Sequence, residues 1–254
     1  MPAFLTFALV APIASFGAIA VGERRPGWDR PARSAILGLV GACLGLARED
    51  DAAQVALATG YAVALLCHAP GRLLADYHTT QVPPTRRGRR FATRAAELAV
   101  AKEELSTILS RRDYRSGAWH LGAIWPRHDD ARWPLPALAQ AMRHPAFTPY
   151  LGRKSCPLGL PLGPEIATAA DAADALLARH RDGPEASLPC ANGQPLREVL
   201  ADPTADTIIV LDADQVDSAD GRRRRTEFRR DQPRSRRRWQ FDLREEAVLS
   251  ADPS

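Results

Sequence analysis

The chain has 254 residues and a formal net charge of +4, and 45% of its residues are hydrophobic. This length allows one large domain or two small ones, and the composition is that of an ordinary soluble protein. Of the 34 basic residues only Lys102 and Lys154 are lysines, so the remainder are arginines. The guanidinium group of arginine pairs bidentately with phosphate and stacks on bases, but a GC-rich genome also favours arginine codons. Composition therefore allows a nucleic-acid partner without identifying one.

Cysteine spacing and apolar runs exclude several classes of protein. No two cysteines form a C-x-x-C pair, so we expect neither a zinc site nor disulfides. The apolar segment 4–21 has no basic residue before it and is interrupted by Pro12, unlike a signal peptide. The apolar run 34–47 is too short to span a bilayer. We therefore expect a cytoplasmic protein with no metal, cofactor or membrane segment.

The first seventy residues predict a β-α-β opening. The apolar run 4–10 indicates a buried strand, which we expect to end at Pro12. After a loop, apolar residues at helical spacing predict a helix over about 32–47, and acidic residues mark the start of a second helix over 51–59. A second buried strand is expected over 61–67. This order is typical of a layered domain of sheet and helices.

The helix predicted over 32–47 carries a pattern of glycines. Gly38, Gly41 and Gly45 are spaced by three and four residues, which places them on adjacent turns. We expect them to form a smooth face on which another stretch of backbone lies closely.

The composition changes over residues 70–116, which contain two prolines in succession and two groups of arginines. We predict a basic, protruding insertion between two core strands, with a helix-like patch over 93–109. A strand over 119–125 and an amphipathic helix over 135–143 are expected to follow.

The rest of the chain alternates loops with short elements. A segment rich in glycine and proline is followed by a predicted helix over 169–180 and a surface loop over 182–206. Basic strands are expected over 207–245. Arginine runs there are typical of solvated or disordered chain, but Phe228, Trp239 and Phe241 interleave with them. We interpret this part as a hairpin with one packed face.

The segment Gly152-Arg153-Lys154-Ser155 has the composition of a phosphate-binding turn. It is not a nucleotide-hydrolysing P-loop, because Arg153 separates the glycine from the lysine and no earlier glycine has the required spacing. Backbone N–H groups and two cations can still converge on a phosphate there. An ordinary exposed turn is the alternative.

Aromatic and basic residues also lie together at Tyr77-His78 and at Arg112 to Tyr114. Single-stranded RNA is bound by such mixtures, because bases stack on rings while arginines neutralise phosphates. The alternative is acid–base cleavage of RNA by Tyr77 and His78. The histidines show no i,i+4 metal pair.

Several segments, in chain order, are similar to one known family. They are residues 33–45, 76–79, 148–158 and 230–239. They resemble the first helix, the start of the thumb, the glycine-rich loop and the final hairpin of the CasD family of type I-E CRISPR Cascade subunits.

The resemblance implies an α+β, RRM-like ferredoxin fold. It implies a single domain over 1–254 with a long thumb insertion over 70–116 and a C-terminal strand hairpin. The implied function is non-catalytic: binding the 5′ handle of the guide RNA (crRNA) in antiviral defence. The implied partners are the CasC backbone subunit, the CasA large subunit and other Cascade subunits. In type I-E systems another subunit, CasE, cuts the precursor RNA, whereas related type I-C subunits cut RNA themselves.

The site residues that follow from this reading fall into two groups. Those expected to hold the handle are Arg33 at an exposed helix start, Ser34, Tyr150, Gly152, Arg153 and Lys154. Those expected to line the thumb are Tyr77, His78, Arg86 and Arg112. Two other functions stay open: a metal-independent endoribonuclease using Tyr77 or Tyr114 with Lys154 and His78, and a membrane- or partner-binding module driven by the arginine tail.

Overall fold

The computed structural model describes residues 1–85, 88 and 90–251, and within them it contains one large sheet. The strands are β1 (Ala3–Ala14), β2 (Arg24–Arg25), β3 (Tyr61–Ala69), β4 (Arg72–Val82), β5 (Ser106–Pro126), β6 (Glu165–Thr168), β7 (Ile208–Asp212), β8 (Arg223–Ser235) and β9 (Gln240–Ser250). The helices are α1 (Arg33–Cys43), α2 (Asp51–Gly60), α3 (Arg94–Glu97), α4 (Leu135–Arg143), α5 (Ala172–Asp182) and α6 (Leu196–Leu200).

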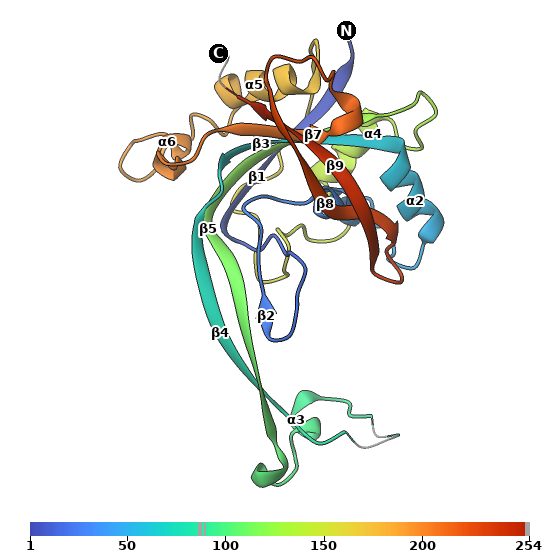
Figure 1. Ribbon diagram of the computed structural model, residues 1–254, viewed down its shortest axis with the longest axis vertical. Helices are drawn as coiled ribbons and strands as arrows, with labels where there is room; N and C mark the ends of the chain where they lie inside the picture. Colours follow the sequence, from blue (N-terminus) through green and yellow to red (C-terminus); the bar gives the residue numbers. More distant parts are fainter. Residues whose placement is uncertain (86–87, 89, 252–254) are drawn as a thin grey trace.

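The sheet is almost entirely antiparallel. Its strand order is β6-β1-β5-β3-β7-β9-β8, and β2 and β4 pair with β5 away from this path. The pair of β2 with β5 is parallel, and the others that the structure describes are antiparallel. Figure 1 shows the sheet with helices on both sides and a long extension below it.

Helices cover both faces of the sheet, so β1 is buried on both sides. Leu5 and Phe7 point into a core shared with α1 and α4, whereas Phe4 and Ala8 point into a second core shared with α5. Alternate residues of a strand face opposite sides of a sheet. Continuous apolar runs are therefore typical of a strand covered on both faces, and this explains the run over 4–10.

The first strand is longer than predicted. We expected it to end at Pro12, but β1 continues to Ala14 and still pairs with β5 at Ala11 and Ile13. Pairing with β6 covers only the segment up to Thr6, so on that side the end of β1 is an edge. Proline is tolerated at a sheet edge because no ladder hydrogen bond is lost there.

The predicted helices differ from the observed ones mainly at their ends. The helix expected over 135–143 is confirmed with those bounds, whereas α1 stops at Cys43, short of residue 47. Gly45 follows with a φ of 73°, which ends the helix in the manner of a C-terminal glycine. The helix-like patch over 93–109 was wrong: it holds only single turns, and the chain from Ser106 onward is strand. Pairing with β4 outweighs the local preference there.

The glycine face of α1 does not receive another backbone, so that expectation was wrong. A Cβ at Gly38 would lie 3.1 Å from the Arg236 guanidinium, and one at Gly41 would lie 3.6 Å from Leu57. Gly45 lies beyond the end of the helix. Side chains from β8–β9 and α2, rather than backbone, therefore pack on this face.

A long hairpin extends from the core. Its strands are β4 and residues 106–116 of β5, and we call this hairpin the arm (Figure 1). Pairing is continuous from Arg72 with Ser116 to Val82 with Ser106. Nearly all side chains of β4 are exposed. A two-stranded hairpin is marginally stable alone, so the arm depends on its attachment to the core sheet.

The C-terminal hairpin β8–β9 forms as predicted, but its packed face was predicted wrongly. Phe228 and Trp239 are 62% and 61% exposed. Three charged residues, Arg229, Asp231 and Glu246, are buried instead, beside the apolar residues 247–249 of β9. Arg229 pairs with Glu246, and Asp231 pairs with Arg244 and accepts from the N–H at the start of α1, so ion pairs rather than the aromatic rings hold the hairpin here.

Candidate nucleic-acid interface

A groove of about 530 Å³ lies where α1, the loop 147–153 and the turn between β8 and β9 meet. It brings together four of the residues predicted from the sequence: Ser34, Tyr150, Gly152 and Arg153. It also contains residues that we did not predict: Arg48, Phe147, Arg236, Trp239 and Phe241. Lys154 is exposed beside the groove but is not part of its lining.

The loop at one side of the groove is fixed by its backbone. Gly152 has a φ of 91°, and a Cβ at this position would lie 1.6 Å from the Ser15 carbonyl oxygen. The Ser15 N–H donates to the Leu151 carbonyl at 3.0 Å, and the Leu151 N–H donates to the Cys156 carbonyl at 2.9 Å. Only glycine combines this dihedral angle with this close approach. The loop is therefore held tightly against the end of β1.

Arg153 is positioned with an unused hydrogen-bond donor. Its Cζ lies 4.7 Å from the centre of the Tyr114 ring, which fixes the plane of the guanidinium. Its Nη1 is buried and has no hydrogen-bond partner among the described residues. A buried N–H group without an acceptor is costly, and a phosphate oxygen is a strong acceptor for it.

The opposite side of the groove holds two arginines that have no carboxylate partner among the described residues. Arg236 donates from Nη2 to the Ser34 carbonyl, and its guanidinium lies over Gly38, where a side chain would collide with it. Arg48 donates from Nε to the Arg236 carbonyl at 3.0 Å. Burial, and then the nearby positive charge of Arg48, lower the pKa of Arg236. Together these contacts create a site of positive potential that favours an anion.

Two aromatic rings complete this side. Trp239 has a φ of 55°, an unusual value for a residue other than glycine, and its side chain is nevertheless exposed. Its ring meets that of Phe241 edge to face, with centroids 5.3 Å apart, and Arg48 lies 4.7 Å from its centre. Strained backbone and exposed aromatic rings are often found at functional sites. The rings offer stacking surface to a base.

Arg33 does not belong to this site, and its expected exposure was wrong. Only 3% of the residue is exposed. Its Nε donates to Asp212 at 3.1 Å, and its Nη2 donates to the carbonyls of Ala58 and Tyr61 at 2.8 and 2.7 Å. Its backbone N–H donates to Asp231 at 2.8 Å. The start of α1 is therefore occupied by carboxylates of the same chain.

The residues predicted to line the thumb lie on two faces of the arm. Residues directly opposite each other in paired strands share a face, and adjacent residues of one strand do not. Tyr77 pairs with Arg111, whereas His78 pairs with Ser110 and Arg112 pairs with Asp76. His78 and Arg112 thus share one face, and Tyr77 is on the other. Arg86, also predicted, lies outside the described residues.

Comparisons with known proteins identify the family. The family model described as CRISPR-associated protein (Cas_Cas5) matches residues 4–245. The chain belongs to this family. A curated relative, the CRISPR system Cascade subunit CasD of Escherichia coli (strain K12), is 32% identical over 185 residues, which are 70% of this chain and 77% of the relative. The resemblance to CasD that the sequence motifs indicated is confirmed.

Solved structures show the same fold. One, titled CRISPR RNA-guided surveillance complex, superposes with a TM-score of 0.60 over 97% of this chain and 89% of the other, at 21% identity. A second, titled Crystal structure of Cas protein, gives a TM-score of 0.55 over 98% and 95%, also at 21% identity. These similarities establish the mixed α/β fold with its large antiparallel sheet, independently of close sequence identity.

The residues proposed for RNA cleavage are not assembled in this Cas5-family chain. Tyr77 and His78 are on opposite faces of the arm. Tyr114 shares the face of His78, but its partner is Leu74, and four residues along a strand span about 13 Å. The imidazole Nδ1 of His78 lies 3.9 Å from the Asp76 carboxylate. An acid and a base must both be within hydrogen-bond reach of the same reacting group. His78 does not form such a pair with Tyr77 or with Tyr114.

Candidate metal ligands and thiols were compared across the described part of this Cas5-family chain. It contains no group of three His, Cys, Asp or Glu residues placed to hold a metal ion. Burial raises the pKa of the Cys43 thiol to about 11 and that of Cys67 to about 12. Both therefore behave as small core residues. No helix among the described residues is long and apolar enough to cross a membrane.

Proposed function

We propose that this chain is a non-catalytic, crRNA-binding subunit of a type I-E Cascade complex that holds the 5′ handle of the guide RNA in the groove. The observation that carries the proposal is the groove's composition. Arg48, Arg153 and Arg236 meet there with exposed aromatic rings, and no carboxylate of the described residues is part of the lining. Cations with stacking surfaces are what single-stranded RNA requires.

Five of the residues predicted from the sequence, together with Trp239, have roles in this proposal. The Nη1 of Arg153, which has no partner among the described residues, donates to a phosphate oxygen, and Lys154 holds a phosphate at the margin. Tyr150 and Trp239 are 39% and 61% exposed and stack on bases. The Ser34 hydroxyl and the backbone of Gly152 supply further polar contacts. Because the loop is held against β1, these groups are positioned before RNA arrives, which lowers the entropic cost of binding.

The proposal includes an RRM-like ferredoxin core. The elements β1, α1, β3, β5, α4 and β6 occur in the chain order β-α-β-β-α-β. Their strands lie in the order β6-β1-β5-β3. Residues 70–116 are then the thumb inserted into a single domain over 1–254, 182–206 a surface loop, and 207–245 the basic strands added after the core.

The proposed partners follow from the relative named as a Cascade subunit. We place the chain in a cytoplasmic ribonucleoprotein with the CasC backbone subunit, the CasA large subunit and other Cascade subunits. The separation of Tyr77, Tyr114 and His78 favours a non-catalytic role over an endoribonuclease.

The double variant Arg153→Ala/Lys154→Ala tests the groove. With a cognate repeat RNA, its binding should depend less on salt than that of the wild type. Each lost phosphate contact lowers the slope of log K against log salt by about 0.7 for single strands, so we expect a decrease of about 1.4. Titrations at several KCl concentrations measure this slope. Arg181→Ala, on α5 and 73% exposed, is the control and should leave the slope unchanged.

The same reactions, run on a denaturing gel, test the absence of catalysis. We expect intact RNA throughout. A single cut that disappears in His78→Ala or Lys154→Ala would contradict the non-catalytic assignment, and an unchanged salt slope in the double variant would contradict the groove.

A further inference from the structure

The segment 183–201 lies on the α5 side of the sheet, next to the root of the arm, and we call it the strap. It contains α6, whose Leu196 and Leu200 pack against the second core. A Cβ at Gly117 would lie 3.2 Å from Leu200. Gly117 separates the part of β5 that pairs with β3 from the part that pairs with β4. Figure 1 shows α6 beside the point at which the arm leaves the sheet, so the strap braces the root of the arm.

Two histidines fasten the strap to the sheet. His68 is the extra residue of a bulge in β3, because Cys67 and Ala69 pair with consecutive residues of β5. A bulge changes the direction in which a side chain points. The His68 Nε2 lies 2.8 Å from the Arg197 carbonyl oxygen in α6, and its Nδ1 lies 3.2 Å from the His180 Nε2 in α5. The strap, β3 and α5 therefore meet at one imidazole ring.

The hydrogen bonds of this histidine pair fix the positions of its protons. A carbonyl oxygen can only accept, so the His68 Nε2 carries the hydrogen that is donated to Arg197. In a neutral His68 the Nδ1 is then an acceptor, and the His180 Nε2 donates to it. The chain of donors therefore runs from His180 through His68 to the strap.

This chain of hydrogen bonds can hold one additional proton but not two. A proton added to the Nδ1 of His180 leaves its Nε2 a donor, so both hydrogen bonds remain. A proton on each ring would place two N–H groups 3.2 Å apart, and it would place two positive charges beside the Arg197 guanidinium, which donates to the His180 carbonyl. Burial lowers the pKa of His68, in agreement with a ring that is held neutral.

The other groups packed around the pair leave this effect to the two histidines. Arg179 of α5 is engaged with Glu185 of the strap, with Nε 2.7 Å from Oε1, and both are buried. Burial lowers the pKa of His120 on the other face of β5 to about 3, and burial raises the pKa of the Cys67 thiol to about 12. Both therefore stay neutral at mildly acidic pH. The remaining charged residues next to the pair in sequence are exposed: Arg181, Asp182 and Glu198.

We propose that the strap is a pH-sensitive latch, which holds the root of the arm while the histidine pair carries at most one additional proton and opens when both rings are protonated. The direction follows from proton linkage. In the open form both rings are solvated and take up protons near the ordinary pKa of about 6.5, whereas the closed form takes up fewer. The closed form is therefore favoured fully above about pH 6.5, and it loses stability as the pH falls below this value.

Hydrogen exchange of the full chain without RNA measures the opening of the strap. The amides of Leu196, Val199 and Ala201 donate to carbonyls within the strap, and a helix as short as α6 is not stable when detached. One extra proton on the open form increases opening about tenfold between about pH 7.5 and about pH 5.5, so protection factors should fall about tenfold. Peptides over 70–76 and 112–118, at the root of the arm, should lose protection in parallel.

Glutamine variants separate the latch from a general effect of acid. In His68→Gln the side-chain amide can donate to the Arg197 carbonyl and accept from His180, but it does not titrate. Protection of its strap should change less than about twofold between the two pH values. His180→Gln keeps a donor to His68 and leaves only one ring to protonate, so it should behave in the same way. Thermal melts at neutral pH verify that both variants are folded.

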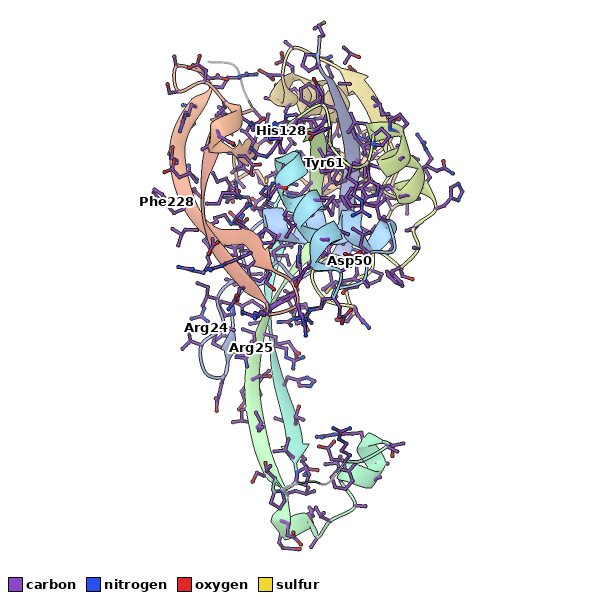
Figure 2. All side chains as sticks on the ribbon, turned by 90° about the vertical axis from the view of Figure 1, so that its right-hand side faces the viewer. Arg24, Arg25, Asp50, Tyr61, His128 and Phe228 are labelled. Carbon is purple, nitrogen blue, oxygen red and sulfur yellow. The ribbon has the colours of Figure 1, made fainter. Side chains whose placement is uncertain are left out.

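His128→Gln is the matched control. His128 is exposed and follows the end of β5 that pairs with Tyr61, and Figure 2 labels it at the end of the body farthest from the arm. This variant should show the same pH-dependent loss of protection as the wild type.

Three outcomes would contradict the latch or part of it. Strap protection in the wild type that does not change with pH, or that falls equally in the wild type and in both latch variants, would overturn the latch. Loss of protection in the strap without a loss over 70–76 would overturn its link to the arm. Because the protein is free of RNA in these experiments, none of these outcomes depends on the proposed function.

Discussion

Arg33→Ala is expected to lower the free energy of unfolding by about 3–5 kcal/mol, the range for breaking a buried ion pair from one side. Arg33 and Asp212 each expose 2% of the side chain. The variant removes the donor to Asp212 and one donor from each of the carbonyls of Ala58 and Tyr61, of which Tyr61 still accepts from Arg127 at 3.3 Å. Buried polar groups that lose their partners cost more than the hydrogen bonds themselves contributed.

The remaining contacts of Asp212 reduce this cost without removing it. Asp212 also accepts from Arg127 and from Arg244, the latter at 3.1 Å. The carboxylate therefore stays paired, but a cavity opens between α1 and the C-terminal hairpin. Arg33→Lys should recover only part of the loss, because an ammonium group cannot reproduce the fork that reaches Asp212 and two carbonyls together.

Urea unfolding of Arg33→Ala and of Arg181→Ala measures the difference. Arg181 is 73% exposed and pairs with its neighbour Asp182, so its loss should change stability by less than about 0.5 kcal/mol. The folded fraction of Arg33→Ala should bind RNA as the wild type does. If the two variants are equally stable, or if Arg33→Ala weakens RNA binding without destabilising the protein, then Arg33 is a binding residue after all.

Local patterns predicted most of the secondary structure. The continuous apolar runs placed β1 and β3, the helical spacing of apolar residues placed α1 and α4, and acidic residues at its start placed α2. These elements follow from periodicity and burial, which are properties of short segments. The arm was harder to predict, because the segment 93–109 has helix-forming composition. Pairing with β4 determines the structure of its last residues.

The groove was only partly predictable because residues near the C-terminal end of the chain line it together with α1 and the loop 147–153. The loop with Gly152 and Arg153 was found through its composition. Arg236 contacts Ser34 across a separation of 202 residues, and no local sequence pattern predicts such a contact. Trp239 was noticed in the sequence but assigned to a packed face, since its backbone angle is visible only in three dimensions.

The two faces of the arm could have been separated from the sequence. Once residues 72–82 are recognised as a strand, the alternation of side chains places Tyr77 and His78 on opposite faces. The pairing of β2 with β5 could not be foreseen, because a strand of two residues has no periodicity to detect.

Gly152→Ala is expected to lower the free energy of unfolding by about 2–5 kcal/mol and to abolish RNA binding in the groove. A left-handed backbone angle costs a residue with a Cβ about 1–2 kcal/mol. The added methyl group would also lie 1.6 Å from the Ser15 carbonyl oxygen, so the loop must leave β1. Forcing extra atoms into a packed site costs about 1–3 kcal/mol more.

Gly193→Ala separates these two causes. Gly193 has a φ of 79°, similar to the 91° of Gly152, but a Cβ there would meet nothing within 4 Å. It should therefore show only the backbone cost, about 1–2 kcal/mol, with unchanged RNA affinity. Urea unfolding and RNA titration of both variants provide the comparison. Because displacement of the loop moves Arg153 away from Tyr114, the two losses in Gly152→Ala should appear together. Equal stability of the two variants would mean that the loop relaxes around the methyl group, and normal RNA binding by Gly152→Ala would mean that the groove does not depend on this loop.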